Sequence, residues 1–169
     1  AQRLTDLGAK VTAKNGNVTA IAIPDGTKLT DADFQQVGKW TGLKSLDVNR
    51  GLTDERLTLL AGLGELEYLQ TNLAQITDDG LKPLARLKSL KSLKMFHPGA
   101  AFSGAGLAHL AELPQLQSLT VAGSLAFNDD GMKAVAKLPR LTEFRSWHAG
   151  VTNQGVPSLK ELPNLKTLN

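Results

Sequence analysis

Apolar residues along this chain fall into recurring anchors separated by polar segments. The first anchor is a segment of the form L-x-x-L-x-x-x, whose alternation is typical of a short strand with one buried face. Its copies are LKSLDVN (43–49), LEYLQTN (66–72), LKSLKMF (90–96), LQSLTVA (116–122), LTEFRSW (141–147) and the shorter LKTLN (165–169), with VTAIAIP (18–24) as an N-terminal seventh. The pattern therefore predicts a series of short, similar strands.

Two further anchors follow each strand at regular distances. The second is an apolar residue before a small polar one: Leu29-Thr30, Leu52-Thr53, Ile76-Thr77, Phe102-Ser103, Phe127-Asn128 and Val151-Thr152. A third apolar anchor comes five residues later, and the next strand begins nine residues after that. These two steps never vary, whereas the step from strand to second anchor does, so repeats run from 23 to 26 residues. A fixed core with insertions at one edge is typical of a solenoid.

The segment between the second anchor and the next strand predicts a short helix. Thr, Ser or Asn at its start is a good N-cap. An Asp follows in four repeats, where the helix dipole favours negative charge: Asp31, Asp54, Asp78 and Asp129. Pro83 and Pro157 fall inside the expected first turns, which predicts late or irregular helices there. One alternative is a single basic amphipathic helix over 81–94, but the repeat register divides that segment near Lys88.

The best copy of the repeat is LQTNLAQITDDGLKPLARL at 69–87. It resembles leucine-rich repeats of the form L-x-x-L-x-L-x-x-T-x-I-T-D-x-G-L-x-x-L, as a cysteine-free version of the cysteine-containing subtype found in bacterial proteins. The resemblance implies a right-handed α/β horseshoe with a parallel sheet on its concave face and short helices on its convex face. The chain departs from the family because Gly51, Ala74 and Pro98 stand where an Asn or Cys ladder is expected. Other groups must therefore replace the ladder's buried hydrogen bonds.

We expect one structural domain, with an N-terminal cap over 1–17 and about six repeats over 18–169. The cap reads as a short helix and a strand that turns back at Asn15-Gly16, and it would cover the apolar end of the solenoid. The chain starts at Ala1 without Met, which suggests a piece of a longer protein. The other end stops within a strand, at LKTLN. Either the native chain continues there or a neighbour covers that end.

Composition narrows the classes of function. No apolar stretch approaches the ~20 residues that span a bilayer, so we expect no membrane insertion. The absence of cysteine excludes disulfides and thiolate chemistry. It leaves a cytoplasmic and an exported location, periplasmic or extracellular, equally open. A net charge of +3 is too small to indicate nucleic-acid binding.

Strand positions three, five and seven should face the concave side, where small polar residues dominate. The exceptions form the predicted partner-binding set: Tyr68, Lys94, Phe96, Arg145, Trp147, Asp47 and Glu143. Aromatic residues and Arg are enriched at protein-binding hot spots, which favours a protein partner. For Phe96 and Trp147 an alternative is open, in which the rings pack under loops such as 97–104.

His97 and His148 are secondary candidates at equivalent positions two repeats apart, with Gly123 between them. Their backbones should lie about 10 Å apart, but zinc requires three or four protein ligands and no third is evident. We therefore expect no metal and no cofactor. The acidic pairs Asp78-Asp79 and Asp129-Asp130 sit at helix starts, where capping explains them. No acid, base and nucleophile converge, so we expect no enzyme.

The resemblance implies a non-catalytic recognition module that binds a macromolecule through the concave sheet and the strand-to-helix loop edge. One alternative is a glycan- or peptide-binding module that stacks its ligand on Tyr68, Phe96 and Trp147, which an aligned row of exposed rings would favour. Another is a spacer or regulatory arm of a larger multidomain bacterial enzyme or redox protein. Partner identity and oligomeric state stay open.

Overall fold

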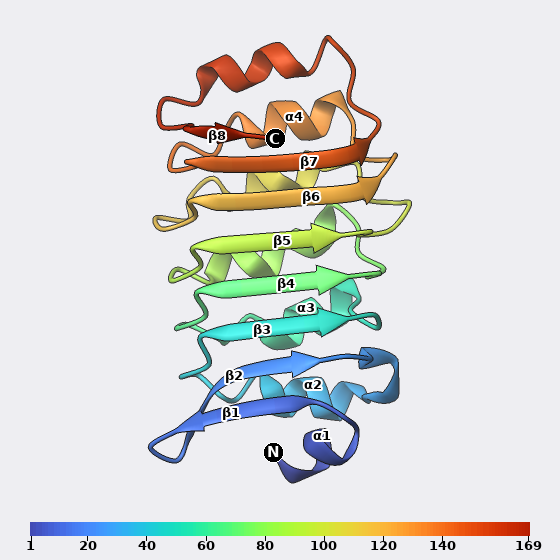
Figure 1. Cartoon of the computed structure of the whole chain (residues 1–169), viewed down its shortest axis with the longest axis vertical. Helices are drawn as coiled ribbons and strands as arrows, with labels where there is room; N and C mark the ends of the chain where they lie inside the picture. Colours follow the sequence, from blue (N-terminus) through green and yellow to red (C-terminus); the bar gives the residue numbers. More distant parts are fainter.

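The computed structural model describes all residues 1–169, which form a single eight-stranded sheet (Figure 1). The strands follow one another in chain order, and every neighbouring pair is parallel except the N-terminal hairpin of β1 and β2. They are β1 (Lys10–Lys14), β2 (Asn17–Ile23), β3 (Ser45–Asn49), β4 (Tyr68–Asn72), β5 (Ser92–Phe96), β6 (Ser118–Ser124), β7 (Glu143–Ala149) and β8 (Thr167–Leu168). The predicted α/β leucine-rich repeat solenoid is confirmed.

A short helical segment connects each parallel strand to the next. The α-helices are α1 (Gln2–Asp6), α2 (Asp31–Val37), α3 (Asp54–Leu60) and α4 (Asp129–Val135), and the 3₁₀ helices are η1 (Gly26–Lys28), η2 (Asp79–Arg86), η3 (Ala105–Leu110) and η4 (Val156–Glu161). In Figure 1, α2, α3 and α4 lie behind the sheet and no element covers its front. We call this uncovered side the open face; it is the side that the sequence places on the concavity. None of the helices has the length and apolar character needed to cross a membrane.

The strand register aligns the apolar anchors of successive repeats. Leu46, Leu69, Leu93, Leu119 and Phe144 are direct register partners, and each is at most 1% exposed. They belong to one continuous core of 40 buried residues. Because side chains alternate across a strand, positions three, five and seven of each copy point to the open face.

Three aspartates bridge successive repeats. The Asp54 carboxylate accepts from the backbone N–H and hydroxyl of Thr77, at 2.9 and 2.7 Å. Asp129 does the same for Thr152, at 2.8 and 2.7 Å, and these bonds lower the pKa of Asp129. The helix-dipole role predicted for these carboxylates is therefore incomplete, since their main partners lie in the next repeat.

Asp78 makes the largest of these bridges. Its Oδ2 accepts from the N–H and hydroxyl of Ser103, and its Oδ1 accepts from the N–H groups of Gly104 and Gly106, both at 2.9 Å. The series is then interrupted, because Gly104 stands where the next Asp would be and the N–H of Asn128 donates to the carbonyl of Ser103 instead. These carboxylates supply part of what the missing Asn or Cys ladder would provide.

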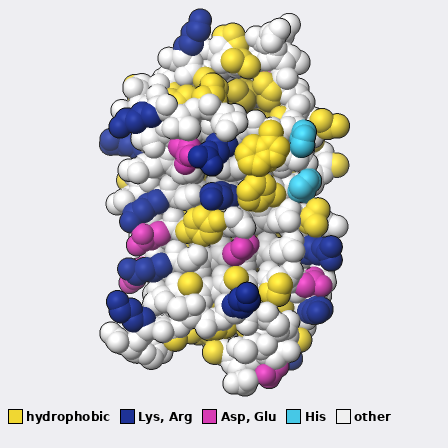
Figure 2. Space-filling view, in the orientation of Figure 1, with side chains coloured by type: hydrophobic (Ala, Val, Ile, Leu, Met, Phe, Trp, Pro, Cys, Tyr) yellow, Lys and Arg dark blue, Asp and Glu magenta, His cyan; other side chains and the backbone are white.

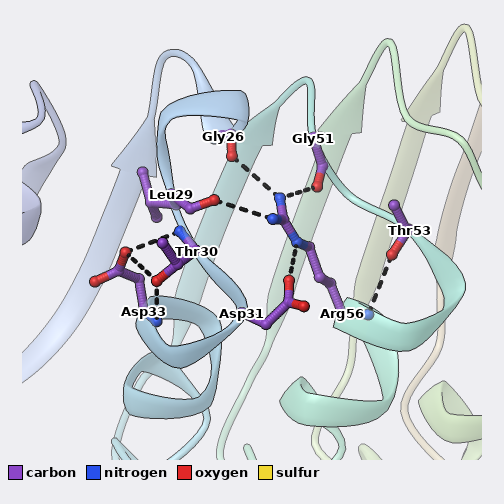
Figure 3. A network of polar contacts seen from close by, with 8 residues as sticks. All are labelled: Gly26, Leu29, Thr30, Asp31, Asp33, Gly51, Thr53 and Arg56. Carbon is purple, nitrogen blue, oxygen red and sulfur yellow. Dashed lines mark hydrogen bonds and ion pairs between the residues drawn. The ribbon is translucent and has the colours of Figure 1, made fainter.

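Arg56 supplies the link between the first two repeats (Figure 3). Its guanidinium donates to the carbonyls of Gly51 at 2.6 Å, Leu29 at 3.0 Å and Gly26 at 3.2 Å. It also pairs with Asp31 at 2.8 Å and lies over the Phe34 ring, 4.6 Å from the centroid. Its side chain is only 16% exposed. One arginine thus satisfies carbonyls of two successive strand-to-helix loops.

The N-terminal cap is tied to the solenoid by a hairpin and an ion pair. Asn15 and Gly16 occupy the turn between β1 and β2, both with positive φ. Arg3 of α1 pairs with the buried Asp33 of α2 at 2.6 Å. Hydrogen bonds from Arg3 hold the pKa of Asp33 well below its usual range, assisted by those from Thr30. Helix α1 is thereby fixed over the first repeat.

Candidate functional site

The register arranges the open face in three rows that run across β3 to β7. Position three carries Ser45, Tyr68, Ser92, Ser118 and Glu143; position five carries Asp47, Gln70, Lys94, Thr120 and Arg145; position seven carries Asn49, Asn72, Phe96, Ala122 and Trp147. The seven predicted partner-binding residues all lie in these rows. Figure 2 shows hydrophobic side chains gathered over part of this face, with two histidines beside them.

Phe96 and Trp147 form an aromatic pair at position seven. They stand two strands apart, so their backbones are about 10 Å apart, yet their ring centroids are only 6.0 Å apart, at an interplanar angle of 50°. Ala122 lies between them in the row and is 2% exposed. The rings lean together above this small residue, and Trp147 stays 43% exposed. Loops do not bury Trp147, and the contact itself was not foreseen from the sequence.

Cationic side chains lie in the row next to this aromatic pair. The Lys94 ammonium lies 5.4 Å from the centroid of the Tyr68 ring and forms no ion pair. Arg145 pairs with Glu143 at 2.6 Å, and Glu143 also accepts from the Ser118 hydroxyl at 2.8 Å. Of the two cations beside the aromatic pair, Arg145 is paired with a carboxylate and Lys94 is not.

Tyr68 belongs to a separate polar group at the N-terminal half of the face. Its hydroxyl donates to Gln70 Oε1 at 2.5 Å, and the Gln70 amide donates to Asp47 at 3.1 Å. Burial raises the pKa of Asp47, against the bond from Gln70, and burial together with the Asp47 charge raises the pKa of Tyr68. Since Tyr68 is at position three and the aromatic pair is at position seven, the three rings do not form one row.

The two histidines follow the aromatic pair directly. His97 and His148 both have positive φ, as do Arg50, Leu73 and Gly123 at the same position of other repeats. The Nδ1 of His97 lies 3.1 Å from Asn72 Oδ1, and its ring covers Gly123 so closely that a Cβ there would come within 2.5 Å of it. The His97 ring thus has a local packing role. No group of three or more His, Asp or Glu side chains is placed to hold a metal ion.

Comparisons with known proteins give a limited result. No family model matches the chain, and no curated protein matches it. Among solved structures, the chain is similar to an internalin from Listeria monocytogenes, with 20% identity, 80% of this chain and 50% of that chain covered, and a TM-score of 0.35. It is also similar to an internalin C2 from the same organism, with 20% identity, 80% and 64% coverage, and a TM-score of 0.47. The chain spans between half and two thirds of these structures. Its assignment as an α/β leucine-rich repeat solenoid therefore follows from its own repeat register and parallel sheet.

Proposed function

We propose that the open face over β4 to β7 binds a protein partner without catalysing a reaction. The observation that supports this most directly is the aromatic pair of Phe96 and Trp147, which remains accessible on a sheet face that no helix covers. Solvent-exposed indole on a solenoid face is a typical anchor for a partner, because burying it removes a large apolar area from water.

The neighbouring charges define the chemistry of that partner. Lys94 lies in the adjacent row and has no acidic partner within this chain, so a carboxylate of the binding partner would form an ion pair with it. Arg145 and Glu143 neutralise each other, and Asp47 is hydrogen-bonded to Gln70. These groups therefore help to orient the bound partner and add little to its electrostatic attraction. The partner segment therefore carries an apolar side chain next to an Asp or Glu.

The alternatives receive less support from the geometry. A glycan-binding module would use a row of three rings, but Tyr68 is in another row, with its hydroxyl bonded to Gln70 and Lys94 over its ring. A spacer or regulatory arm makes no use of the aromatic pair at all. If the chain were only a spacer or regulatory arm, substitutions at Phe96 and Trp147 would leave the activity of the larger protein unchanged.

Selection of binding peptides tests the proposal. The purified chain is used as bait against a library of random displayed peptides, and selected peptides are measured individually against variants by calorimetry. We expect apolar-acidic peptides whose affinity falls at least about tenfold, or about 1.4 kcal/mol, in the F96A/W147A double variant. Lys94→Ala should weaken the acidic peptides selectively.

Leu125→Ala is the matched control, because Leu125 is 80% exposed but lies in the loop after β6, outside the three rows. Its affinity for the peptides should equal that of the wild type, and all variants should keep the wild-type melting temperature. Peptides that bind the double variant as tightly as the wild type would show that the aromatic pair is not the binding site.

A further inference from the structure

A cleft lies outside the open face, at the edge where the parallel strands begin. It is a cleft of about 400 Å³ between the tip of the β1–β2 hairpin, the loop after α2 and the start of β3. Its principal side chains are Lys14, Thr19, Lys39, Trp40, Lys44 and Glu65. The sequence did not indicate it, because these residues come from three separate segments, near residues 14–19, 39–44 and 65, and belong to no common motif.

The cleft exists because the hairpin extends past the sheet. Parallel pairing of β2 with β3 begins only at Ala20, opposite Ser45, and the N–H of Lys44 donates to the Thr19 carbonyl at 2.9 Å. Residues 14–18 therefore project beyond the strand edge, as the loop between β1 and β2 does in Figure 1. This overhang makes one wall, and the loop after α2 makes the other.

Trp40 departs from the repeat at this point. The same repeat position carries a buried leucine in every later repeat, at most 7% exposed: Leu63, Leu87, Leu113, Leu138 and Leu162. Trp40 packs against the core but is only partly buried, and it lines the cleft. An indole therefore faces a cavity where the other repeats have a closed apolar contact.

The charges in the cleft are unbalanced. Lys14, Lys39 and Lys44 enter it from three different segments, and Glu65 is the one carboxylate in its lining. Neither Lys14 nor Lys39 forms an ion pair, and Lys44 reaches a carboxylate only at Glu67, 3.8 Å away and outside the cleft. Like charges that line one cleft repel one another, and a bound anion would relieve that repulsion.

We propose that this cleft binds a small anionic ligand that bears a phosphate or sulfate group and a flat ring. Lysine ammonium groups bind such oxyanions as point charges, and the Trp40 indole offers a face on which a ring stacks. The volume lies within the range typical of small-molecule sites. The cleft is separate from the open face, so its test is independent of the protein-binding proposal.

Nuclear magnetic resonance titration of the ¹⁵N-labelled chain tests this inference, with phenyl phosphate and phenyl sulfate as probes at low ionic strength. We expect saturable shifts of the Trp40 indole N–H and of amides in residues 14–19, while the backbone amides of α4, which lies in neither the cleft nor the open face, serve as an internal reference and stay unchanged. Benzyl alcohol, which has the ring without the anion, should produce no saturable shift.

The variant Lys39→Ala should weaken binding about tenfold, since it removes one of the three positive charges that line the cleft. Lys137→Ala is the matched control, because Lys137 is exposed at the same repeat position but faces no such cleft. Saturation by one probe alone would identify phosphate or sulfate as the preferred group. Absence of saturation with both probes, or equal weakening by Lys137→Ala, would overturn the proposal.

Discussion

At the scale of single residues, side chains that break the repeat have the most specific roles. Arg56 stands where no other repeat has an arginine, and it satisfies three carbonyls around Gly51 while contacting Phe34. A planar guanidinium with five donors can do this, whereas an ammonium cannot reach the same acceptors together. Trp40 and Trp147 likewise stand where other repeats have smaller residues.

Replacing Arg56 with lysine should therefore destabilise the protein although the charge is kept. We expect the free energy of unfolding to fall by about 2 kcal/mol, because buried carbonyls lose their donors. Urea denaturation followed by circular dichroism measures the change. Arg86→Lys is the control, since Arg86 is exposed and forms no ion pair, and a similar loss in that variant would contradict the role given to the Arg56 network.

At the scale of elements, the aspartate bridges coincide with the type of helix that follows. Thr30, Thr53 and Asn128 cap their own helices with a side-chain oxygen, and α2, α3 and α4 follow them. The hydroxyls of Thr77, Ser103 and Thr152 also accept an N–H of their own segment, but they donate in addition to an aspartate of the preceding repeat. The 3₁₀ helices η2, η3 and η4 follow them. The irregularity expected at Pro83 and Pro157 is confirmed, but η3 contains no proline. The hydroxyl bond to the carboxylate is the feature that all three share.

Asp78→Asn tests the bridges, because Asp78 accepts from four donors. An Asn amide would place N–H groups against the N–H of Ser103, so we expect a loss of about 2 kcal/mol in the free energy of unfolding. Asp129→Asn should cost less, since Asp129 makes its two short hydrogen bonds with Thr152, whereas Asp78 accepts from four donors. The adjacent Asp79 is exposed and pairs only with Lys82, so Asp79→Asn should stay within about 0.5 kcal/mol. Equal losses at Asp78 and Asp79 in chemical denaturation would refute the bridging role.

At the scale of the whole molecule, the two ends of the solenoid differ in cover. The hairpin and α1 close the N-terminal end, where Leu4 and Ala9 are buried in the core. At the other end β8 has two residues, Val156 is 48% exposed and Leu168 is 56% exposed. Each repeat of a solenoid is stabilised by its neighbours, so local opening should require least free energy at the C-terminal end.

Hydrogen exchange measures this gradient at matched amides. The N–H of Lys166 donates to the Thr142 carbonyl just as that of Lys91 donates to the Glu67 carbonyl, both at 2.8 Å. In a protein of residues 1–169 we expect Lys166 to exchange at least about tenfold faster than Lys91, because in that chain only Lys91 has repeats packed on both sides. Equal protection of the two amides would mean that the solenoid opens as one cooperative unit.

The sequence by itself determined the repeat, the apolar core and which side chains share a face, while the resemblance to leucine-rich repeats implied the parallel sheet. This was possible because the five- and nine-residue steps are constant, so each side chain's orientation follows from its place in the repeat. It also placed the predicted partner-binding residues on one face, although their role in binding remains a prediction.

The tertiary structure decided which of those side chains touch. The contact of Phe96 with Trp147 depends on the small Ala122 between them, and the Asp78 bridge depends on the path of a variable-length loop. The Trp40 cleft depends on how far the hairpin extends past β3. Periodicity fixes the direction in which a side chain points, whereas these contacts depend on side-chain size and loop geometry in neighbouring repeats, which the period does not encode.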